Sequence, residues 1–150
     1  MKLRDIGFAV AAFAWMGLIF YLSSLSVGSS GDGNFHPIEG VAVYWQGGLR
    51  SYAGHILLFG VLTALIQAAL WGWDLGFRVR WMITAAFLAT LFGVTDEYHQ
   101  SFVFGREASG SDLLVDAVAA AASAALLWTL ATGRTRMAVQ AVIFRLTSQT

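Results

Sequence analysis

The residues whose chemistry stands out lie between Asp96 and Asp116, in the segment DEYHQSFVFGREASGSDLLVD. Carboxylates, imidazoles and a guanidinium gathered in this way can transfer protons, bind a polar ligand or hold a metal ion. The segment lies between two apolar runs, one that begins at Trp81 and one that Asp116 opens. Charged groups on membrane helices cost several kcal/mol when they face lipid, so we expect these groups to point into a helix bundle or a water-filled cavity.

Helical spacing groups these side chains, because residues three or four positions apart lie on the same face of a helix. Further polar residues stand upstream, at the end of the first apolar run and at the start of the second. The predicted stripes are Asp96, His99 and Gln100, with Glu97 to one side; Asp112 and Asp116; and Ser51 with His55, while Tyr21, Ser23 and Ser24 close the first apolar run.

The composition indicates an integral membrane protein of a single domain, residues 1–150. Of its 150 residues, 57 % are hydrophobic and only 12 % are charged, which is an unusual balance for a soluble protein of this size. The formal net charge is +0, so no global field favours nucleic acid as a partner. The chain has no cysteine, which excludes disulfides, thiolate metal sites and cysteine nucleophiles.

Four segments are long and apolar enough to cross a bilayer, which takes about 20 residues of helix. We predict spans at residues 6–25, 52–73, 81–103 and 112–131, and hence an all-α fold of four transmembrane helices. A cleaved signal peptide is the alternative for the first span, because Lys2 and Arg4 precede it and small residues follow it. Its apolar run exceeds the usual signal-peptide core of about 7–15 residues, which favours a retained helix.

The positive charges predict the orientation of the spans. The N-terminus, the second loop and the tail hold Lys2, Arg4, Arg78, Arg80, Arg134, Arg136 and Arg145, and the other loops hold Arg50 and Arg106. The positive-inside rule therefore places both termini in the cytoplasm. The aromatic residues agree: the inner boundary then holds Trp71, Trp73, Trp81 and Trp128, and Tyr21, Tyr44, Tyr52 and Tyr98 lie toward the outer boundary.

This orientation brings the polar helix ends together on the outer side, where we expect a polar pocket sunk into the outer half of the bundle. Asp96 is predicted about 10 Å below the outer end of its span, at about 1.5 Å per residue. Arg106, between the third and fourth spans, is placed over the mouth and could hold a phosphate or a carboxylate. The alternative is that Arg106 pairs with Glu97, Glu107 or Asp112 and only fastens the hairpin.

Two segments outside the spans are open to more than one interpretation. Residues 26–51 start with a flexible composition and continue as VAVYWQGGL, which could lie on the membrane surface or fold over the pocket as a lid. Residues 134–147 mix arginines with apolar residues, which suits either a short helix at the inner interface or a fraying terminus.

The motifs of several enzyme classes are absent. There is no HExxH, and His36 stands in a loop, so we expect no bound metal and no cofactor. The residues that could still supply an oxygen and nitrogen metal site are His55, Asp96, Glu97, His99 and Asp116. No GxSxG marks a serine nucleophile. Two aspartates on facing helices, Asp96 with Asp112 or Asp116, could form an aspartyl dyad.

The order Asp-Glu-x-x-Gln, then Gly-Arg, then an Asp with a second polar residue four positions later, resembles the VanZ-like family. Here these residues are Asp96, Glu97, Gln100, Gly105, Arg106, Asp112 and Asp116, with Ser23 or Ser24 and His55 upstream. The resemblance covers roughly residues 21–125. Two places depart from it: Asp116 stands where members often have Asn, and Ser51 and Tyr52 stand where they often have an Asp-Lys pair.

The resemblance implies a small multi-pass protein of the bacterial cytoplasmic membrane whose founding relative is linked to teicoplanin resistance. Teicoplanin is an acylated glycopeptide that acts on cell-wall precursors outside the cell. Our first hypothesis is therefore a protein that binds or handles the head group of an amphiphile, such as a lipid-linked phosphate, an envelope glycolipid or an acylated glycopeptide. The ligand-binding residues are then Ser24, His55, Asp96, Glu97, Gln100, Arg106, Asp112 and Asp116.

Two other hypotheses stay open. The protein could be an enzyme for a lipid-linked substrate, in which Asp96 or Glu97 acts as general base with help from His99 or His55. It could also be a structural accessory subunit whose motif only stabilises the helix hairpin. Membrane lipids are the expected partners, and a thin bundle of four helices is also compatible with a homodimer.

Overall fold

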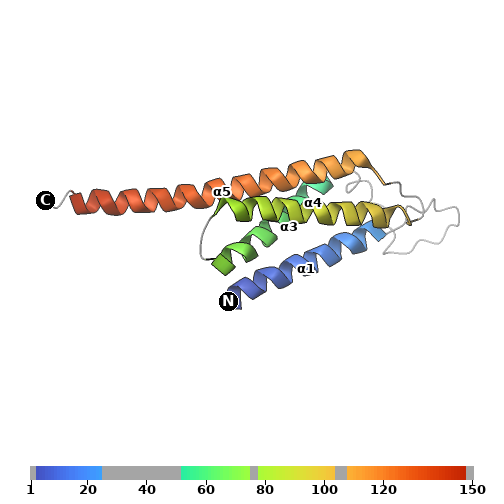
Figure 1. Cartoon of the computed structure of the whole chain (residues 1–150), viewed down its shortest axis with the longest axis horizontal. Coiled ribbons are helices and arrows are strands. Elements are labelled where there is room, and N and C mark those ends of the chain that lie inside the picture. Colours follow the sequence, from blue (N-terminus) through green and yellow to red (C-terminus); the bar gives the residue numbers. More distant parts are fainter. Residues whose placement is uncertain (1–2, 25–51, 75–77, 104–107, 148–150) are drawn as a thin grey trace, which may run out of the picture.

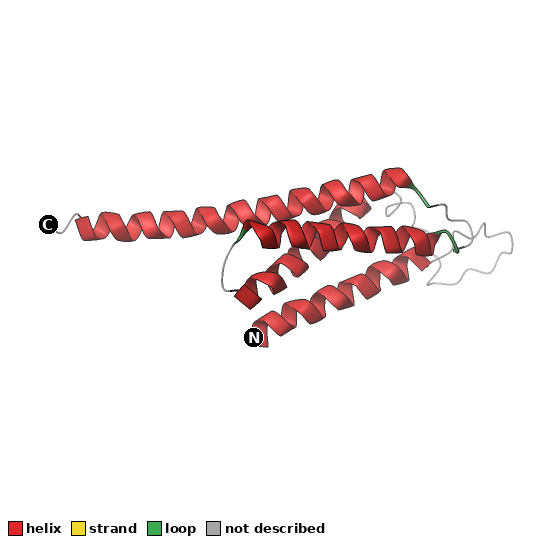
Figure 2. Ribbon diagram, in the orientation of Figure 1, coloured by secondary structure: helices red, strands yellow, loops and turns green. Residues whose placement is uncertain are grey.

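The computed structural model describes residues 3–24, 52–74, 78–103 and 108–147 (Figure 1). These stretches form four helices, α1 (Leu3–Ser24), α3 (Tyr52–Asp74), α4 (Val79–Gln100) and α5 (Gly110–Thr147). No strand occurs within them (Figure 2). The segment 26–51, for which we predicted a surface element or a lid, lies outside the described residues, as do Ser51 and Arg106.

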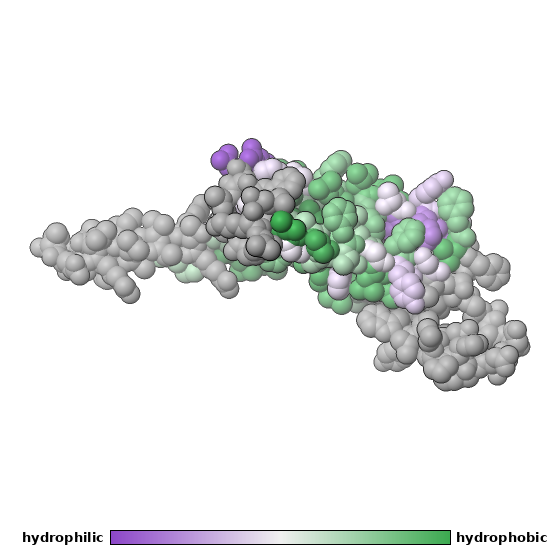
Figure 3. Space-filling model, turned by 90° about the horizontal axis from the view of Figure 1, so that it is seen from below, coloured by the Kyte–Doolittle hydropathy of each residue, from purple (hydrophilic) through white to green (hydrophobic). Residues whose placement is uncertain are grey.

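Each helix contains an apolar stretch long enough to cross a membrane, namely Ile6–Ser24, Tyr52–Gly72, Val79–Gln100 and Gly110–Gly133. Large apolar side chains such as Phe13, Phe87 and Leu114 are exposed on the outside of the bundle. Figure 3 shows the resulting hydrophobic belt, with hydrophilic atoms gathered near its two ends. Helices satisfy their own backbone hydrogen bonds, as a chain in lipid requires. The protein is an all-helical, multi-pass membrane protein.

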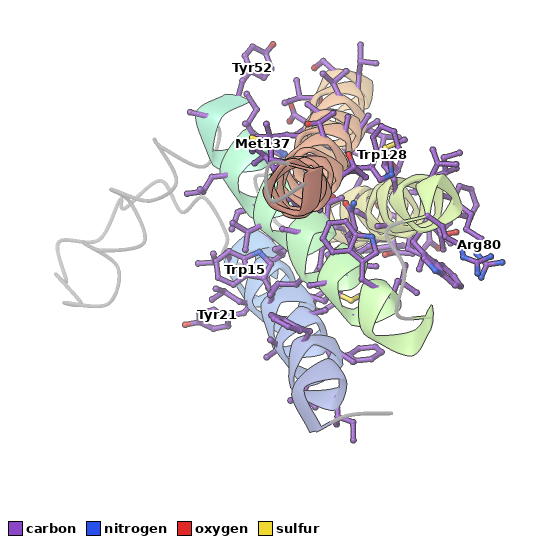
Figure 4. All side chains as sticks on the ribbon, turned by 90° about the vertical axis from the view of Figure 1, so that its left-hand side faces the viewer. Trp15, Tyr21, Tyr52, Arg80, Trp128 and Met137 are labelled. Carbon is purple, nitrogen blue, oxygen red and sulfur yellow. The ribbon has the colours of Figure 1, made fainter. Side chains whose placement is uncertain are left out.

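The helices α3 and α4 each contact the other three helices, and α3 packs more extensively against α1 than α4 does. The helix α5 packs against α3 and α4, whereas α1 packs against α3 and, over the smallest interface, against α4. The described parts of α1 and α5 do not contact each other. Viewed along the bundle, α1 and α5 lie on opposite sides, and the side chains of Tyr21 and Tyr52 point outward (Figure 4). The helix α1 is therefore the outermost member of the bundle.

Small residues allow close helix packing in the core. Ala89 of α4 and Ala119 and Ala120 of α5 are buried against larger side chains of α1 and α3. Those larger side chains are Ile19, Phe59 and Leu62. The alanines at positions 119 and 120 thus allow α5 to approach its neighbours closely.

Hydrogen bonds in the apolar interior join α3 to α5. The hydroxyl of Ser123 donates to Gly60 O at 2.8 Å, and Nε2 of Gln67 donates to Ala124 O at 3.2 Å. Interhelical hydrogen bonds in lipid contribute about 0.6–2 kcal/mol each. Because they run between side chains and the backbone of a neighbouring helix, they also fix the register of α3 against α5.

The helices α4 and α5 end at other residues than the sequence predicts. The sequence predicts a third span that reaches Val103, whereas α4 ends at Gln100 and residues 101–103 form a turn with backbone bonds three or four residues back. Asp96 therefore lies about 6 Å, rather than about 10 Å, from the end of its helix. The helix α5 runs without a break to Thr147, so residues 134–147 continue the same helix beyond its apolar stretch (Figure 1). Their position at the inner interface stays a prediction.

Gly93→Ala is expected to destabilise the bundle by overpacking. A Cβ at Gly93 would lie 3.2 Å from Phe59 Cε1, 3.4 Å from Leu113 Cδ1 and 3.5 Å from Asp116 Oδ2. Overpacking costs about 1–3 kcal/mol, and the better helix propensity of alanine returns about 1 kcal/mol. Gly17→Ala is the control, because nothing lies within 4 Å of a Cβ there. In detergent, Gly93→Ala should melt at a lower temperature than Gly17→Ala; equal values would contradict the close packing.

Candidate functional site

Polar side chains of all four helices meet at one end of the bundle. The helices α1 and α4 end there, and α3 and α5 begin there, at the right of Figure 1. We call this region the polar end. Its residues are Ser23, Ser24, His55, Asp96, Glu97, His99, Gln100, Ser109, Asp112 and Asp116.

Both carboxylate oxygens of Asp96 in α4 have hydrogen-bond donors. The hydroxyl of Ser23 in α1 donates to Oδ1 at 2.6 Å, and Nε2 of Gln100 donates to Oδ2 at 2.8 Å. All three residues are buried. A buried carboxylate without donors costs several kcal/mol. Ser23 and Gln100 therefore stabilise Asp96 inside the bundle, and the Ser23 contact holds α1 against α4.

His99 makes a second contact between α4 and α1. Its Nε2 lies 2.9 Å from Ser24 Oγ, and its ring stacks on Phe20 with centroids 3.9 Å apart. The Ser24 hydroxyl also lies 2.6 Å from Phe20 O, to which it can donate, and His99 Nε2 can then donate to Ser24 Oγ in the matching tautomer. The Ser24–His99 pair therefore connects the end of α1 to α4.

His55 of α3 faces two carboxylates of α5. Its Nδ1 lies 2.9 Å from Asp116 Oδ1, and its Nε2 lies 4.0 Å from Asp112 Oδ2. The Asp116 carboxylate can accept the Nδ1 proton and so fix the orientation of the ring. At 4.0 Å, Nε2 and Asp112 are too far apart for a hydrogen bond. An imidazole held in this way can bind a ligand or exchange a proton through Nε2.

Glu97 connects α4 to the start of α5. Its Oε2 accepts the backbone N–H of Ser109 at 2.7 Å, and the Ser109 hydroxyl accepts the backbone N–H of Asp112 at 3.3 Å. In a capping box, a glutamate three residues into the helix binds the N–H of the capping residue; here a glutamate from the neighbouring helix does so. Its carboxylate also lies near the positive end of the α5 dipole. Glu97 thus fixes where α5 begins, and with it the position of Asp112 and Asp116.

Exposure divides the polar end into a buried part and an accessible part. Asp116, Asp96 and Glu97 are only 1 %, 3 % and 7 % exposed. The side chains of His55 and Asp112 are 13 % and 28 % exposed. His55 and Asp112 are therefore the partly accessible groups beside the buried carboxylates at the start of α5, while Ser24 is exposed at the end of α1. The sequence predicts an open pocket lined by these carboxylates. In the described structure the carboxylates are buried and hydrogen-bonded, and the open pocket stays a prediction.

The structure divides the predicted site residues into two groups. Ser24, Asp96, His99 and Gln100 belong to the contact of α1 with α4, whereas His55, Glu97, Asp112 and Asp116 surround the start of α5. Among the described contacts, the carboxylate that pairs with a histidine is Asp116, rather than Asp96 or Glu97. Within the described stretches, no group of three or more His, Asp or Glu side chains is placed to hold a metal ion.

Sequence reasoning missed the roles of two residues. The Ser109 backbone N–H is the partner of Glu97, and the Phe20 ring stacks on His99. The spacing of Ser109 and Asp112 ahead of an apolar run is a recognisable helix start, so the cap could have been found. The Phe20 contact left no such signal, because it joins helices that are far apart in the sequence.

Comparison with known proteins supports one family. A family model described as VanZ/LLP1 matches residues 8–131. This range extends from α1 into the transmembrane part of α5 and includes every residue of the polar end. Comparisons with curated proteins and with solved structures found no match.

Ser23→Ala is expected to destabilise the protein through Asp96. The change removes one donor from a buried carboxylate, at a cost of about 1–3 kcal/mol, and should lower the melting temperature in detergent. Ser23→Thr keeps a hydroxyl and serves as the control. In an Asp96→Asn background Ser23→Ala should lower the melting temperature less, because no buried carboxylate loses a hydrogen-bond donor. An equal cost in both backgrounds would show that the hydroxyl does not act through Asp96.

His55→Leu is expected to destabilise the contact of α3 with α5, because it leaves the Asp116 carboxylate buried without its partner. Breaking a buried pair of this kind costs about 3–5 kcal/mol. Adding Asp116→Asn removes the unpaired carboxylate, so the double variant should melt at a higher temperature than His55→Leu alone. A double variant that is less stable than His55→Leu would argue against the pairing.

Proposed function

This chain belongs to the VanZ/LLP1 family, and we propose that it binds the head group of an amphiphile at the polar end of its bundle. The acyl or prenyl chain of the amphiphile stays in the lipid beside the hydrophobic belt, and the head group contacts His55 and Asp112. Membership of the family fits a membrane protein associated with teicoplanin resistance.

The observation that carries this proposal is the arrangement around His55. Its Nδ1 lies 2.9 Å from the buried Asp116, while the side chains of His55 and Asp112 are both partly exposed, with Nε2 4.0 Å from Asp112 Oδ2. Polar groups at this depth in a membrane protein are costly and are by default functional. With Nδ1 donating to Asp116, Nε2 of the neutral imidazole is an acceptor beside the Asp112 carboxylate, and two acceptors held by helices make a preorganised surface for the hydroxyls or amines of a head group.

The proposed ligand combines hydroxyl or amine groups with a negative charge. Nε2 of His55 and the Asp112 carboxylate complement hydroxyls and amines. Arg106, three residues before Ser109 in the sequence, supplies a cation for a phosphate or carboxylate of the same head group. Glu97 positions Ser109 and the start of α5. A lipid-linked phosphate, an envelope glycolipid and an acylated glycopeptide antibiotic each provide part or all of this chemistry.

We further propose that the polar end faces the outer side of the bacterial cytoplasmic membrane. The distribution of lysine and arginine along the sequence supports this orientation. Amphiphiles of the outer leaflet and acylated antibiotics outside the cell then have direct access to His55 and Asp112. The proposed role is maintenance of the cell envelope or resistance to glycopeptides.

The His55–Asp116 hydrogen bond also favours a second candidate function, an enzyme that acts on a lipid-linked substrate. A carboxylate that orients an imidazole through Nδ1 leaves Nε2 as an acid or base, which is the arrangement found in many hydrolases. In this case His55 transfers the proton, and Asp96, Glu97 and His99 have supporting roles. His55→Gln should then keep the ligand bound and abolish its conversion.

Native mass spectrometry of the purified protein tests the binding proposal. The wild type should carry a co-purified lipid, and His55→Gln, Asp112→Asn and Arg106→Ala should each lower its occupancy at least tenfold, about 1.4 kcal/mol. Thr95→Ala is the matched control, since the exposed Thr95 only donates to Phe92 O in its own helix. Normal occupancy in all three variants, with melting temperatures unchanged, would refute the site.

A further inference from the structure

We infer that the end of α1 acts as an intramolecular substitute for the ligand. The hydroxyls of Ser23 and Ser24 occupy the positions that hydroxyls of a bound head group take when the end of α1 moves away from α4. The inference rests on the proposed function and deepens it, because it selects amphiphiles with hydroxyl-bearing head groups, such as glycolipids. It also makes α1 the element that controls access from the lipid.

The first step is that the described structure is closed. Asp96, Glu97 and Asp116 are at most 7 % exposed, so a head group cannot reach them without movement of a helix. The shortest hydrogen bond to any of these carboxylates comes from α1, from the Ser23 hydroxyl to Asp96 at 2.6 Å. A hydroxyl of the chain itself therefore fills the acceptor position at Asp96.

The second step is that α1 is the helix best able to move. It does not contact the described part of α5, and its interface with α4 is the smallest of the helix–helix interfaces. By contrast, α3 and α5 are joined through Ser123 and Gln67 deep in the apolar interior. The hydrogen bond from Trp15 Nε1 to Leu58 O at 2.9 Å and the buried Ile19 keep the rest of α1 on the bundle, so the movement we infer is confined to the last turn, which carries Ser23 and Ser24.

The third step is that the hydrogen bonds to be broken can be exchanged one for one. The hydrogen bonds from Ser23 to Asp96 and between Ser24 and His99 lie in the last turn of α1, and Ser24 is exposed. A ligand hydroxyl that replaces a serine hydroxyl keeps the hydrogen bond, so the exchange leaves no buried acceptor unsatisfied. Apolar packing offers a head group no such exchange.

Distance measurements between spin labels test this inference. The chain has no cysteine, so Tyr21→Cys on α1 and Val94→Cys on α4, both at exposed positions, can be labelled selectively. In phosphatidylcholine nanodiscs without added ligand, Ser23→Ala and Ser24→Ala should each lengthen the label distance in part of the molecules. The expected increase is about 5 Å, roughly half the axial distance of packed helices. Ser23→Thr and Thr95→Ala should leave the distance unchanged.

The second arm adds the ligand chemistry to the labelled chain with its native serines. Nanodiscs that contain diglucosyl diacylglycerol should show the same longer distance, whereas phosphatidic acid, which offers a phosphate and no hydroxyl, should not. A lengthening with phosphatidic acid alone would assign the displacement to phosphate and overturn the inference. Unchanged distances in both serine variants would overturn it as well, and so would serine variants that lengthen the distance while the glycolipid has no effect.

Two features keep these results separate from failures of folding or of the binding proposal. Ser24 is exposed, so Ser24→Ala should fold even if Ser23→Ala, which removes a buried hydroxyl, does not. In that case the label distance in Ser24→Ala alone decides the first arm. The binding proposal is tested by His55→Gln and Asp112→Asn, which lie outside the contact of α1 with α4. If His55→Gln and Asp112→Asn lose binding while the label distances in the serine variants stay unchanged, the α1 inference is overturned and the binding proposal stands.

Discussion

Carboxyl groups inside an apolar helix bundle need hydrogen-bond partners from the protein, because lipid supplies none. This requirement shapes the whole polar end. Asp96 accepts a hydrogen bond from the Ser23 hydroxyl of α1, and Asp116 is paired with His55 of α3. Glu97 accepts the backbone N–H of Ser109, the residue that caps the start of α5. Each carboxylate thus joins a different pair of helices. The contacts that satisfy the charges are also the contacts that hold the helix ends together.

The same requirement explains why structural and ligand-binding roles are hard to separate in this motif. A residue such as Glu97 positions α5 and lies next to the groups that face outward. Exposure provides the distinction, because His55 and Asp112 are partly accessible while the carboxylates behind them are buried. In the proposed function the accessible pair contacts the ligand, and the buried pairs keep it in position.

The rest of the bundle combines a firm frame with one loosely held helix. Small residues and interior hydrogen bonds join α3 to α5, and Gly93 allows α4 to approach both. The helix α1 packs on this frame through Ile19, and polar contacts and the Phe20 ring connect its end to α4. Polar contacts can be replaced by other hydroxyls, whereas close packing cannot, which is why the movement we infer lies at the last turn of α1.

The sequence by itself determined the four membrane helices, because the length of an apolar run and the charges that bound it are local properties. It also named most residues of the polar end, since helical spacing shows which of them share a face. It placed the end of α4 three residues too late, because the backbone turn at residues 101–103 has no strong sequence signal. Only the tertiary structure decided the partners: Asp96 with Ser23, His99 with Ser24, and His55 with Asp116. Those pairings depend on the rotation and crossing of packed helices, which spacing along one helix does not contain.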